Sequence, residues 1–430
     1  MKITIIGGGL SGLTAALLLS KNHEVTVFEK DDCLGGMASS YLIKWDENMY
    51  NISRTYHHIL DNDTTTIDFI KKFNLENKLK RKKAKQGFIY NNKIIGFSTP
   101  LEFLKFPISF FDKIKLLKFI LFDLKQKDWN KLDNVNAKQW ITQKAGETNF
   151  NVFFSKLIKN KFHDSAENIT ASWVGTRLVK ESSSFLKKFN WLEGGIIQII
   201  NGFEEGIKKN NGKIILNAEV TAINHEDKKL IYKDKDGSEK EYDFDVAVST
   251  IAPELFLSVI DQIHNDIKKQ LEEIKYLSCI CAVFGLKKQL TNYYWLNILD
   301  ENLPFSVVFN HTALYEDASP KNKSVIYITT YLRNTENLWS LTEEEIKNIY
   351  INSIKKIIPE FEENIEWYKV FKLKYAEAIY RLGFINPPIN YDNIYFAGIY
   401  KIYPKIRNMA SAMEEGIDVA NEIEKRLNNV

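Results

Sequence analysis

A glycine-rich stretch near the start of the chain constrains the fold more than any other feature. It runs from Ile5 to Lys30 and reads IIGGGLSGLTAALLLSKNHEVTVFEK. A short apolar run leads into the glycines, a segment rich in helix formers follows them, and a second apolar run ends at Glu29. This order predicts a buried strand, a helix and a second parallel strand, which together form a right-handed β-α-β unit.

The spacing of three glycines gives this unit a binding role. Gly7 permits a tight turn, Gly9 lets the backbone approach a pyrophosphate, and Gly12 lets the helix pack closely on the strand. The diphosphate would lie against free N–H groups at the helix N-terminus, where the helix dipole favours an anion. Glu29 would accept hydrogen bonds from ribose hydroxyls. The neighbouring residues of this predicted dinucleotide cradle are Leu10, Ser11 and Lys30.

A second pair of glycines, Gly35 and Gly36, follows the second strand in the segment DDCLGGMASS. The first motif is satisfied equally by a nicotinamide dinucleotide and by a flavin dinucleotide. A second glycine pair would let another backbone segment, continuing through Met37, approach the same diphosphate. Such a double approach suits a cofactor that is held throughout turnover, whereas the alternative is an ordinary loop.

The C-terminal segment NIYFAGIYKIYPKIRNMASAMEEGIDVANEI supplies a separate indication of flavin. It predicts a strand that ends near Gly398, a loop, and a helix that begins near Met409. The start of that helix could place a backbone N–H against a carbonyl oxygen of the flavin's pyrimidine ring. This contact would stabilise the negative charge of the reduced ring, whereas the alternative is a capped helix that docks on the core.

These segments together resemble the FAD-dependent amine oxidase superfamily, which includes monoamine oxidases, protoporphyrinogen oxidase and phytoene desaturase-type enzymes. The resemblance also covers WLEGGIIQIINGFEEGIKKNNGKIILNAEVTAI, in which the backbone of Val220 would contact the adenine, and the segment DVAVSTIAP. The chain departs from the family at Ile399, where a Glu is common, and at Leu34, where an Arg is common. Because the sequence has no Cys near Gly398, FAD is expected to be non-covalent.

The resemblance implies an α/β protein with two interleaved domains. A Rossmann-like FAD-binding domain, of the GR2-type flavoprotein fold, would comprise residues 1–63, 188–260 and 386–430. An α+β substrate domain would comprise residues 64–187, whose pattern is mostly helical, and residues 261–385, which predict an antiparallel sheet.

Four residues are candidates for a catalytic role. His57 and His58 follow the cradle and could line the flavin face or act as acid–base groups, whereas the alternative is a capping or surface pair. Tyr403 and Arg407 lie in the loop before the C-terminal helix, near which aromatic residues flank the substrate amine in the family that the chain resembles. The cationic Arg407 would suit an anionic substrate better than a protonated amine.

Three functions remain open at the level of sequence. The first is an FAD-dependent oxidase or dehydrogenase that transfers a hydride from a C–H bond of a small molecule to flavin N5. That substrate would be an amine, or the carbon framework of a tetrapyrrole or isoprenoid. The second is a redox-neutral enzyme of the UDP-galactopyranose mutase type that acts on a nucleotide sugar or another anionic substrate. The third is a flavin-binding scaffold without catalysis.

Charge and cysteine content bear on the partners, the compartment and the metal content that we expect. A net charge of +3 gives no indication of a nucleic-acid partner, and none is expected. The three cysteines, Cys33, Cys279 and Cys281, form no CxxC pair, which suits a reducing compartment and a cytoplasmic location. No histidine pair accompanies them at ligand spacing, so no metal site is expected.

The amphipathic segment from Phe110 to Leu124 leaves peripheral membrane association open as an alternative location. No uninterrupted run of about 18 apolar residues occurs, so the sequence predicts no membrane-spanning helix. The lysine-rich run from Lys78 to Lys85 is most simply a solvated face, but together with this amphipathic segment it could dock peripherally on an anionic membrane. The sequence gives no indication of the oligomeric state.

Overall fold

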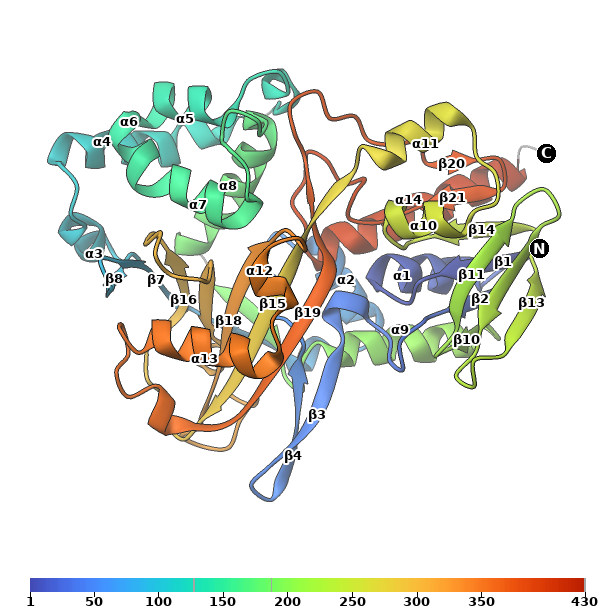
Figure 1. Ribbon diagram of the computed structural model, residues 1–430, viewed down its shortest axis with the longest axis horizontal. Helices are drawn as coiled ribbons and strands as arrows, with labels where there is room; N and C mark the ends of the chain where they lie inside the picture. The colour runs from blue at the N-terminus through green and yellow to red at the C-terminus, as the bar shows by residue number, and fades with distance from the viewer. Residues whose placement is uncertain (127, 187, 429–430) are drawn as a thin grey trace.

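The computed structural model describes residues 1–126, 128–186 and 188–428, and its glycine-rich stretch forms the predicted β-α-β unit (Figure 1). Strands β1 (Lys2–Ile6) and β2 (Glu24–Phe28) pair in parallel and are joined by helix α1 (Leu10–Leu19). They belong to a six-stranded sheet in the order β10-β2-β1-β14-β21-β20. Its other strands are β10 (Lys213–Ile215), β14 (Val246–Ser249), β20 (Asn390–Tyr391) and β21 (Ile394–Phe396). The sheet is thus assembled from three separate parts of the chain.

Helices and a small meander complete this unit. Helix α1 packs against both α9 (Ile197–Lys209) and α14 (Met409–Asn428). An antiparallel meander consists of β11 (Glu219–Asn224), β12 (Lys229–Lys233) and β13 (Glu239–Asp243). Two short helices, α10 (Pro253–Val259) and α11 (Asn265–Glu272), follow β14 along the chain.

A second, seven-stranded sheet lies beside the first unit, in the order β19-β15-β18-β17-β16-β7-β8. All neighbours in it are antiparallel except β16 and β7, which run in parallel. Helices α12 (Asn337–Ser340) and α13 (Glu343–Ile354) lie between β18 and β19 along the chain. The strands are β7 (Lys85–Tyr90), β8 (Lys93–Gly96), β15 (Lys275–Leu286), β16 (Tyr293–Ile298), β17 (Val307–Asn310), β18 (Ser324–Leu332) and β19 (Ile365–Ile379).

Residues 79–96 differ from the helical pattern expected there, because they form β6 (Leu79–Lys82), β7 and β8. The turn between β7 and β8 contains Asn91 and Asn92, whose φ angles are +53° and +56°. Asparagine tolerates the left-handed region, and two consecutive residues there favour a tight hairpin over a continuous helix. The hairpin extends the large sheet by pairing β7 with β16, a partner about 200 residues away in sequence.

The helical part of the 64–187 segment covers one side of the large sheet (Figure 1). The helices on this side are α3 (Pro100–Lys105), α4 (Phe110–Leu121), α5 (Ala137–Ala145), α6 (Glu147–Asn149), α7 (Ser155–Phe162) and α8 (Ala171–Leu186). The first helix of the segment, α2 (Thr64–Lys72), packs instead against α14 of the first unit. Short strands β5 (Ile59–Leu60), β6 and β9 (Phe189–Leu192) form a small sheet, and β3 (Ser40–Trp45) pairs with β4 (Asn48–Ser53) in a hairpin.

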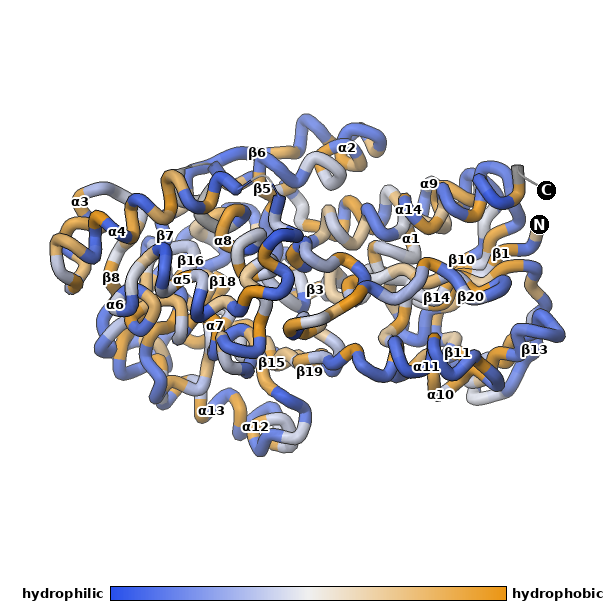
Figure 2. The backbone as a smooth tube through the Cα atoms, turned by 90° about the horizontal axis from the view of Figure 1, so that it is seen from above, coloured by the Kyte–Doolittle hydropathy of each residue, from blue (hydrophilic) through white to orange (hydrophobic). Residues whose placement is uncertain are grey.

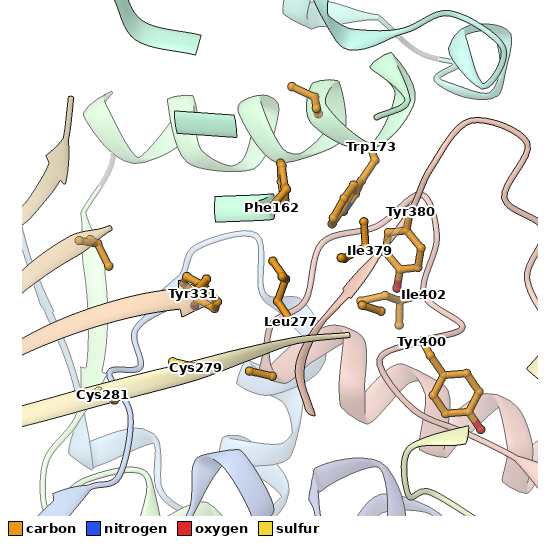
Figure 3. Packing of buried hydrophobic residues seen from close by; sticks show 14 of the residues in the cluster. Phe162, Trp173, Leu277, Cys279, Cys281, Tyr331, Ile379, Tyr380, Tyr400 and Ile402 are labelled. Carbon is orange, nitrogen blue, oxygen red and sulfur yellow. The ribbon is translucent and has the colours of Figure 1, made fainter. Parts of the chain in front are cut away.

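One apolar core joins the helices to the large sheet (Figure 3). The ring of Trp173 in α8 lies 4.2 Å from that of Phe162 in α7 and 4.7 Å from that of Tyr380, which follows β19. Cys279 and Cys281 of β15 are buried in the same cluster and have no partner for a disulfide. This continuous packing fixes α7 and α8 against the strands that carry the residues described next.

Candidate functional site

Gly7, Gly9 and Gly12 shape the turn between β1 and α1 as their spacing predicts. Gly7 has a φ of +106°, a conformation that residues with a side chain rarely adopt. A Cβ atom on Gly12 would overlap the carbonyl oxygen of Gly7, so the helix approaches the turn as closely as glycine allows. Gly9 precedes α1 at its N-cap, and the position of its absent Cβ has no atom within 4 Å. The turn therefore presents open backbone at the start of the helix.

The second glycine pair lies directly against this turn. The Gly35 N–H donates to the carbonyl oxygen of Gly8 at 2.8 Å, and Gly35 bridges Gly9 in parallel. Both Gly35 and Gly36 have positive φ, +106° and +55°, and a Cβ on Gly36 would lie 3.3 Å from the Cα of Gly9. Two backbone segments thus meet beside the N-terminus of α1, which is the arrangement that a shared diphosphate requires.

Glu29 is buried beneath the same turn. Its Oε2 accepts the Gly8 N–H at 2.7 Å and its Oε1 accepts the Asp31 N–H at 2.8 Å. Burial raises the pKa of the Glu29 carboxyl. The two backbone hydrogen bonds lower it, but their effect is smaller. Each carboxylate oxygen has a second lone pair, so Glu29 can still accept from a ribose hydroxyl. Lys30, next to it, pairs with Asp31 at 2.9 Å.

Other predicted cradle residues lie on the elements around the turn. Leu10 and Ser11 form the first turn of α1 and are buried. Val220 lies in β11, at a register shift in the pairing with β12, and the adjoining Ala218 N–H donates to the carbonyl oxygen of Glu29 at 2.8 Å. This hydrogen bond holds β11 at the Glu29 end of the cradle.

The start of α14 lies close to the cradle. A Cβ on Gly416 of α14 would overlap the carbonyl oxygen of Ser11, so the two helices touch backbone to backbone. Gly398 has a φ of +149° after β21, and Met409 is the buried first residue of α14. Ser39, two residues after Met37, has a buried Oγ without a hydrogen-bond partner in the described residues. Open glycine backbone, a buried acid and this unsatisfied hydroxyl together fit a dinucleotide such as FAD.

His57 and His58 lie in the loop between β4 and β5 and are partly buried. The Nδ1 of His57 is 2.9 Å from the carbonyl oxygen of Thr55, and the Nδ1 of His58 is 3.1 Å from the Tyr294 hydroxyl. Burial lowers the pKa of each imidazole to about 4; for His57 the Thr55 carbonyl opposes this effect. Because a carbonyl only accepts, the neutral His57 ring carries its proton on Nδ1 and offers Nε2 as an acceptor.

A buried ion cluster, here called the Glu377 cluster, consists of Glu377, Arg407, Lys161, Tyr331 and Tyr56. One Glu377 oxygen lies 3.0 Å from Arg407 Nε and 2.9 Å from Lys161 Nζ. Arg407 Nη2 donates to the Tyr331 hydroxyl at 2.8 Å, which is 3.0 Å from the Tyr56 hydroxyl. Burial would raise the pKa of Glu377, but Lys161 and Arg407 lower it to about 2. Glu377 is therefore ionised and pairs with two largely buried cations.

This cluster connects the cradle to the substrate region. Arg407 Nη1 lies 3.5 Å from the sulfur of Met37, which directly follows the second glycine pair. Burial is the main cause of the lowered pKa of His57, and the positive charge of Arg407 adds to it. Three of the four candidate catalytic residues, His57, His58 and Arg407, therefore belong to the same part of the molecule.

A pocket opens from the Glu377 cluster between the helices and the large sheet. Three residues of the cluster, Tyr56, Lys161 and Tyr331, are among its lining residues. The other lining residues are mainly apolar or aromatic and include Phe154, Ile158, Phe162 and Trp295, with the cationic Arg177 among them. A concave, largely apolar pocket with a few convergent polar groups is typical of a small-molecule site.

Tyr403 lies in a different environment. Its hydroxyl donates to Asp133 at 2.6 Å and is 3.2 Å from the hydroxyl of Thr170. Burial raises the pKa of Tyr403 to about 12, and the hydrogen bond to Asp133 adds to this effect. These contacts tie the loop before α14 to the helical region, and the catalytic role of Tyr403 stays a prediction.

The residues that partner Arg407 have weak signals in the sequence. Glu377 lies in β19 between Ala376 and Ala378, all three of them buried. A lone acid within a short buried run of a strand is a signal for a compensating cation, since buried charges are normally paired. Lys161 and Tyr331 carry no comparable signal, because only the packing of α7 on β18 brings them together.

The sequence is similar to known flavoproteins over nearly its whole length. The model of the family described as flavin containing amine oxidoreductase matches residues 10–424. An uncharacterized protein of Methanocaldococcus jannaschii is 28% identical over 257 residues, which cover 59% of this chain and 59% of that protein. This match therefore spans less than two thirds of the relative's own length.

Solved structures share the fold at low sequence identity. A protein of Exiguobacterium, provisionally named as a protoporphyrinogen oxidase, has a TM-score of 0.77 at 15% identity, with 99% of each chain covered. Reduced UDP-galactopyranose mutase has a TM-score of 0.75 at 15% identity, covering 99% of this chain and 95% of that one. Putrescine oxidase bound to putrescine has a TM-score of 0.71 at 16% identity, with 99% of each chain covered. These likenesses confirm the predicted α/β fold, a Rossmann-like FAD-binding domain with a substrate domain.

Proposed function

Because the chain belongs to the flavin containing amine oxidoreductase family, we propose that it is an FAD-dependent oxidoreductase of a small organic molecule. FAD would be held without a covalent bond by the glycine cradle. The substrate would donate a hydride from a C–H bond, either beside an amine nitrogen or within a carbon framework of the tetrapyrrole or isoprenoid kind.

The main support for this proposal is that the Glu377 cluster contacts both the pocket and the cradle. Tyr331 and Tyr56 line the pocket, and Arg407 contacts both Tyr331 and Met37, which follows Gly36 in the chain. A substrate in the pocket would thus lie next to a cofactor in the cradle. Positioning of this kind, with water excluded by apolar walls, supplies a large part of the rate enhancement in hydride transfer.

When bound, FAD supplies the hydride acceptor at N5, and the protein supplies orientation and proton handling. The aromatic and aliphatic walls of the pocket would exclude water from the reacting carbon. Nε2 of the neutral His57 could accept a proton from the substrate, because Nδ1–H is held by the Thr55 carbonyl. Arg407 would hold Tyr331 and Tyr56 in fixed positions through its hydrogen bond to the Tyr331 hydroxyl.

A redox-neutral reaction of the mutase type is the second candidate. Lys161 and Arg177 line the pocket, and in the Glu377 cluster one carboxylate faces two cations, Lys161 and Arg407. The resulting net positive charge favours a substrate that carries an anionic group. The likeness to UDP-galactopyranose mutase supports this alternative at the level of fold.

The absorbance spectrum of the purified holoprotein tests both reactions. We expect an oxidised flavin spectrum, and we expect acid precipitation of the protein to release FAD into the supernatant. Anaerobic bleaching by an added amine or tetrapyrrole would support oxidation. Turnover of a nucleotide sugar only after prior reduction would instead support the mutase. Absence of bleaching and of spectral shift across the panel would favour a non-catalytic flavin-binding scaffold.

His57→Asn is expected to slow flavin bleaching by the substrate about 100-fold, since a positioned acid–base group contributes about 10²–10⁴-fold. Because burial lowers the pKa of His57 to about 4, wild-type bleaching should be constant from neutral pH to about pH 5 and fall below it. The exposed His264 provides the control, His264→Asn, which should bleach at the wild-type rate. Equal bleaching rates for His57→Asn and wild type would remove His57 from the mechanism.

A further inference from the structure

Among the described residues, the largest group of exposed apolar side chains lies on α4 and at its C-terminal end, at the end of the molecule opposite the termini (Figure 2). Phe110, Phe111 and Phe122 have exposed fractions of 65%, 75% and 66%. We call this surface the α4 face; it consists of Phe110, Phe111, Ile114, Leu117, Leu121 and Phe122. A soluble surface rarely exposes so many large apolar side chains together, and such patches mark interaction sites.

The residues of the α4 face are not the ones that pack the helix on the core. Leu116 and Phe119 point inward and are buried, and the ring of Phe119 lies 5.2 Å from that of Trp140 in α5. The core therefore uses one stripe of α4, while a second apolar stripe faces outward. The neighbouring α3 adds the exposed Leu101 and Leu104 to the same end of the molecule.

Charges around the α4 face identify the kind of partner. Exposed lysines lie within or beside it: Lys105, Lys115, Lys118 and Lys125. Three acids of the same segment have partners other than these lysines. Glu102 caps α3, Asp112 bonds to Ser109 at the start of α4, and Asp123 pairs with Lys144. The surface therefore presents phenylalanine and leucine interleaved with unneutralised positive charge.

From this pattern we infer that the α4 face docks the protein on the surface of an anionic lipid bilayer. Interfacial helices combine lysines with phenylalanine and leucine, whereas lysine is depleted at protein–protein interfaces. No helix among the described residues is long and apolar enough to cross a membrane. The helix would instead lie in the plane of the headgroups, with its phenylalanines among the acyl chains and its lysines near the phosphates.

Co-sedimentation of the holoprotein with lipid vesicles tests this inference. We expect binding to vesicles that contain phosphatidylglycerol, and weaker binding to pure phosphatidylcholine or at high salt. The double variants Phe111→Ser/Phe122→Ser and Lys115→Glu/Lys118→Glu should each lose about tenfold or more in vesicle affinity. The matched control is Leu42→Ser/Met49→Ser, which changes two exposed apolar residues on the β3–β4 hairpin and should bind like wild type.

Three outcomes would overturn the inference. The first is failure of the wild-type protein to sediment with anionic vesicles. The second is equal sedimentation of the α4-face variants and the control. The third is a dimer, seen by sedimentation velocity without lipid, that Phe111→Ser/Phe122→Ser dissociates, because a second copy would then cover the α4 face. Unchanged flavin absorbance in each variant shows that the fold is intact.

Discussion

Gly9→Val is expected to remove the flavin from the protein while leaving the fold intact. The backbone of Gly9 has an ordinary extended conformation, with φ of −74° and ψ of 175°, so a side chain there causes no strain. The position of its Cβ has no atom within 4 Å, so the polypeptide offers no clash. The same space is where a diphosphate would meet the N-terminus of α1, and a branched side chain would fill it. We expect cofactor affinity to fall by more than about tenfold, or ~1.4 kcal/mol.

The comparison with Gly12→Ala separates binding from folding. A Cβ on Gly12 would overlap the Gly7 carbonyl oxygen, so this change should destabilise the fold itself by about 1–3 kcal/mol or more. Both variants are measured by flavin content after purification and by thermal unfolding of the flavin-free protein. Gly9→Val should lose flavin and keep the wild-type apoprotein melting temperature, whereas Gly12→Ala should melt lower. A Gly9→Val protein with full flavin content would place the cofactor elsewhere.

The cradle could be predicted from sequence because its determinants are local. The spaced glycines, the apolar strands and the acid Glu29 all lie within the first 36 residues, and each indicates a local backbone conformation or contact. The meeting of Gly9 with Gly35 follows from the same stretch, since β1 and β2 are neighbours in the sheet. The later strands of this sheet could be predicted as strands from their apolar runs, but their order in the sheet could not be.

The catalytic neighbourhood could be predicted only in part, because long-range packing assembles it. His57 and Arg407 are 350 residues apart, and their partners come from α7, β18 and β19. No local pattern indicates that Lys161 will meet Glu377. The sequence places Tyr403 in the loop before α14, but no local pattern indicates that its hydroxyl will bond to Asp133. The β7–β8 hairpin was missed for the same reason, because pairing with β16 overrides a weak local preference.

Glu377→Gln is expected to destabilise the protein by about 3–5 kcal/mol, because it leaves Arg407 and Lys161 buried without an anion. Glu254→Gln makes the same chemical change in the surface pair with Lys374 and should cost less than about 1 kcal/mol. Removing one cation as well, in Glu377→Gln/Lys161→Met, should recover part of the loss. Urea unfolding followed by tryptophan fluorescence measures all of these variants.

The pH dependence of stability gives a second, independent signature of Glu377. Its pKa is lowered from 4.5 to about 2, so its contribution is complete above about pH 4.5 and is lost as the pH falls towards 2. Wild type should therefore lose more stability across that range than Glu377→Gln does. Substrate-driven bleaching at neutral pH should also slow in Glu377→Gln, because Arg407 would no longer be held against Tyr331. A Glu377→Gln variant as stable as Glu254→Gln, with the same acid dependence as wild type, would show that this carboxylate does not compensate the two cations.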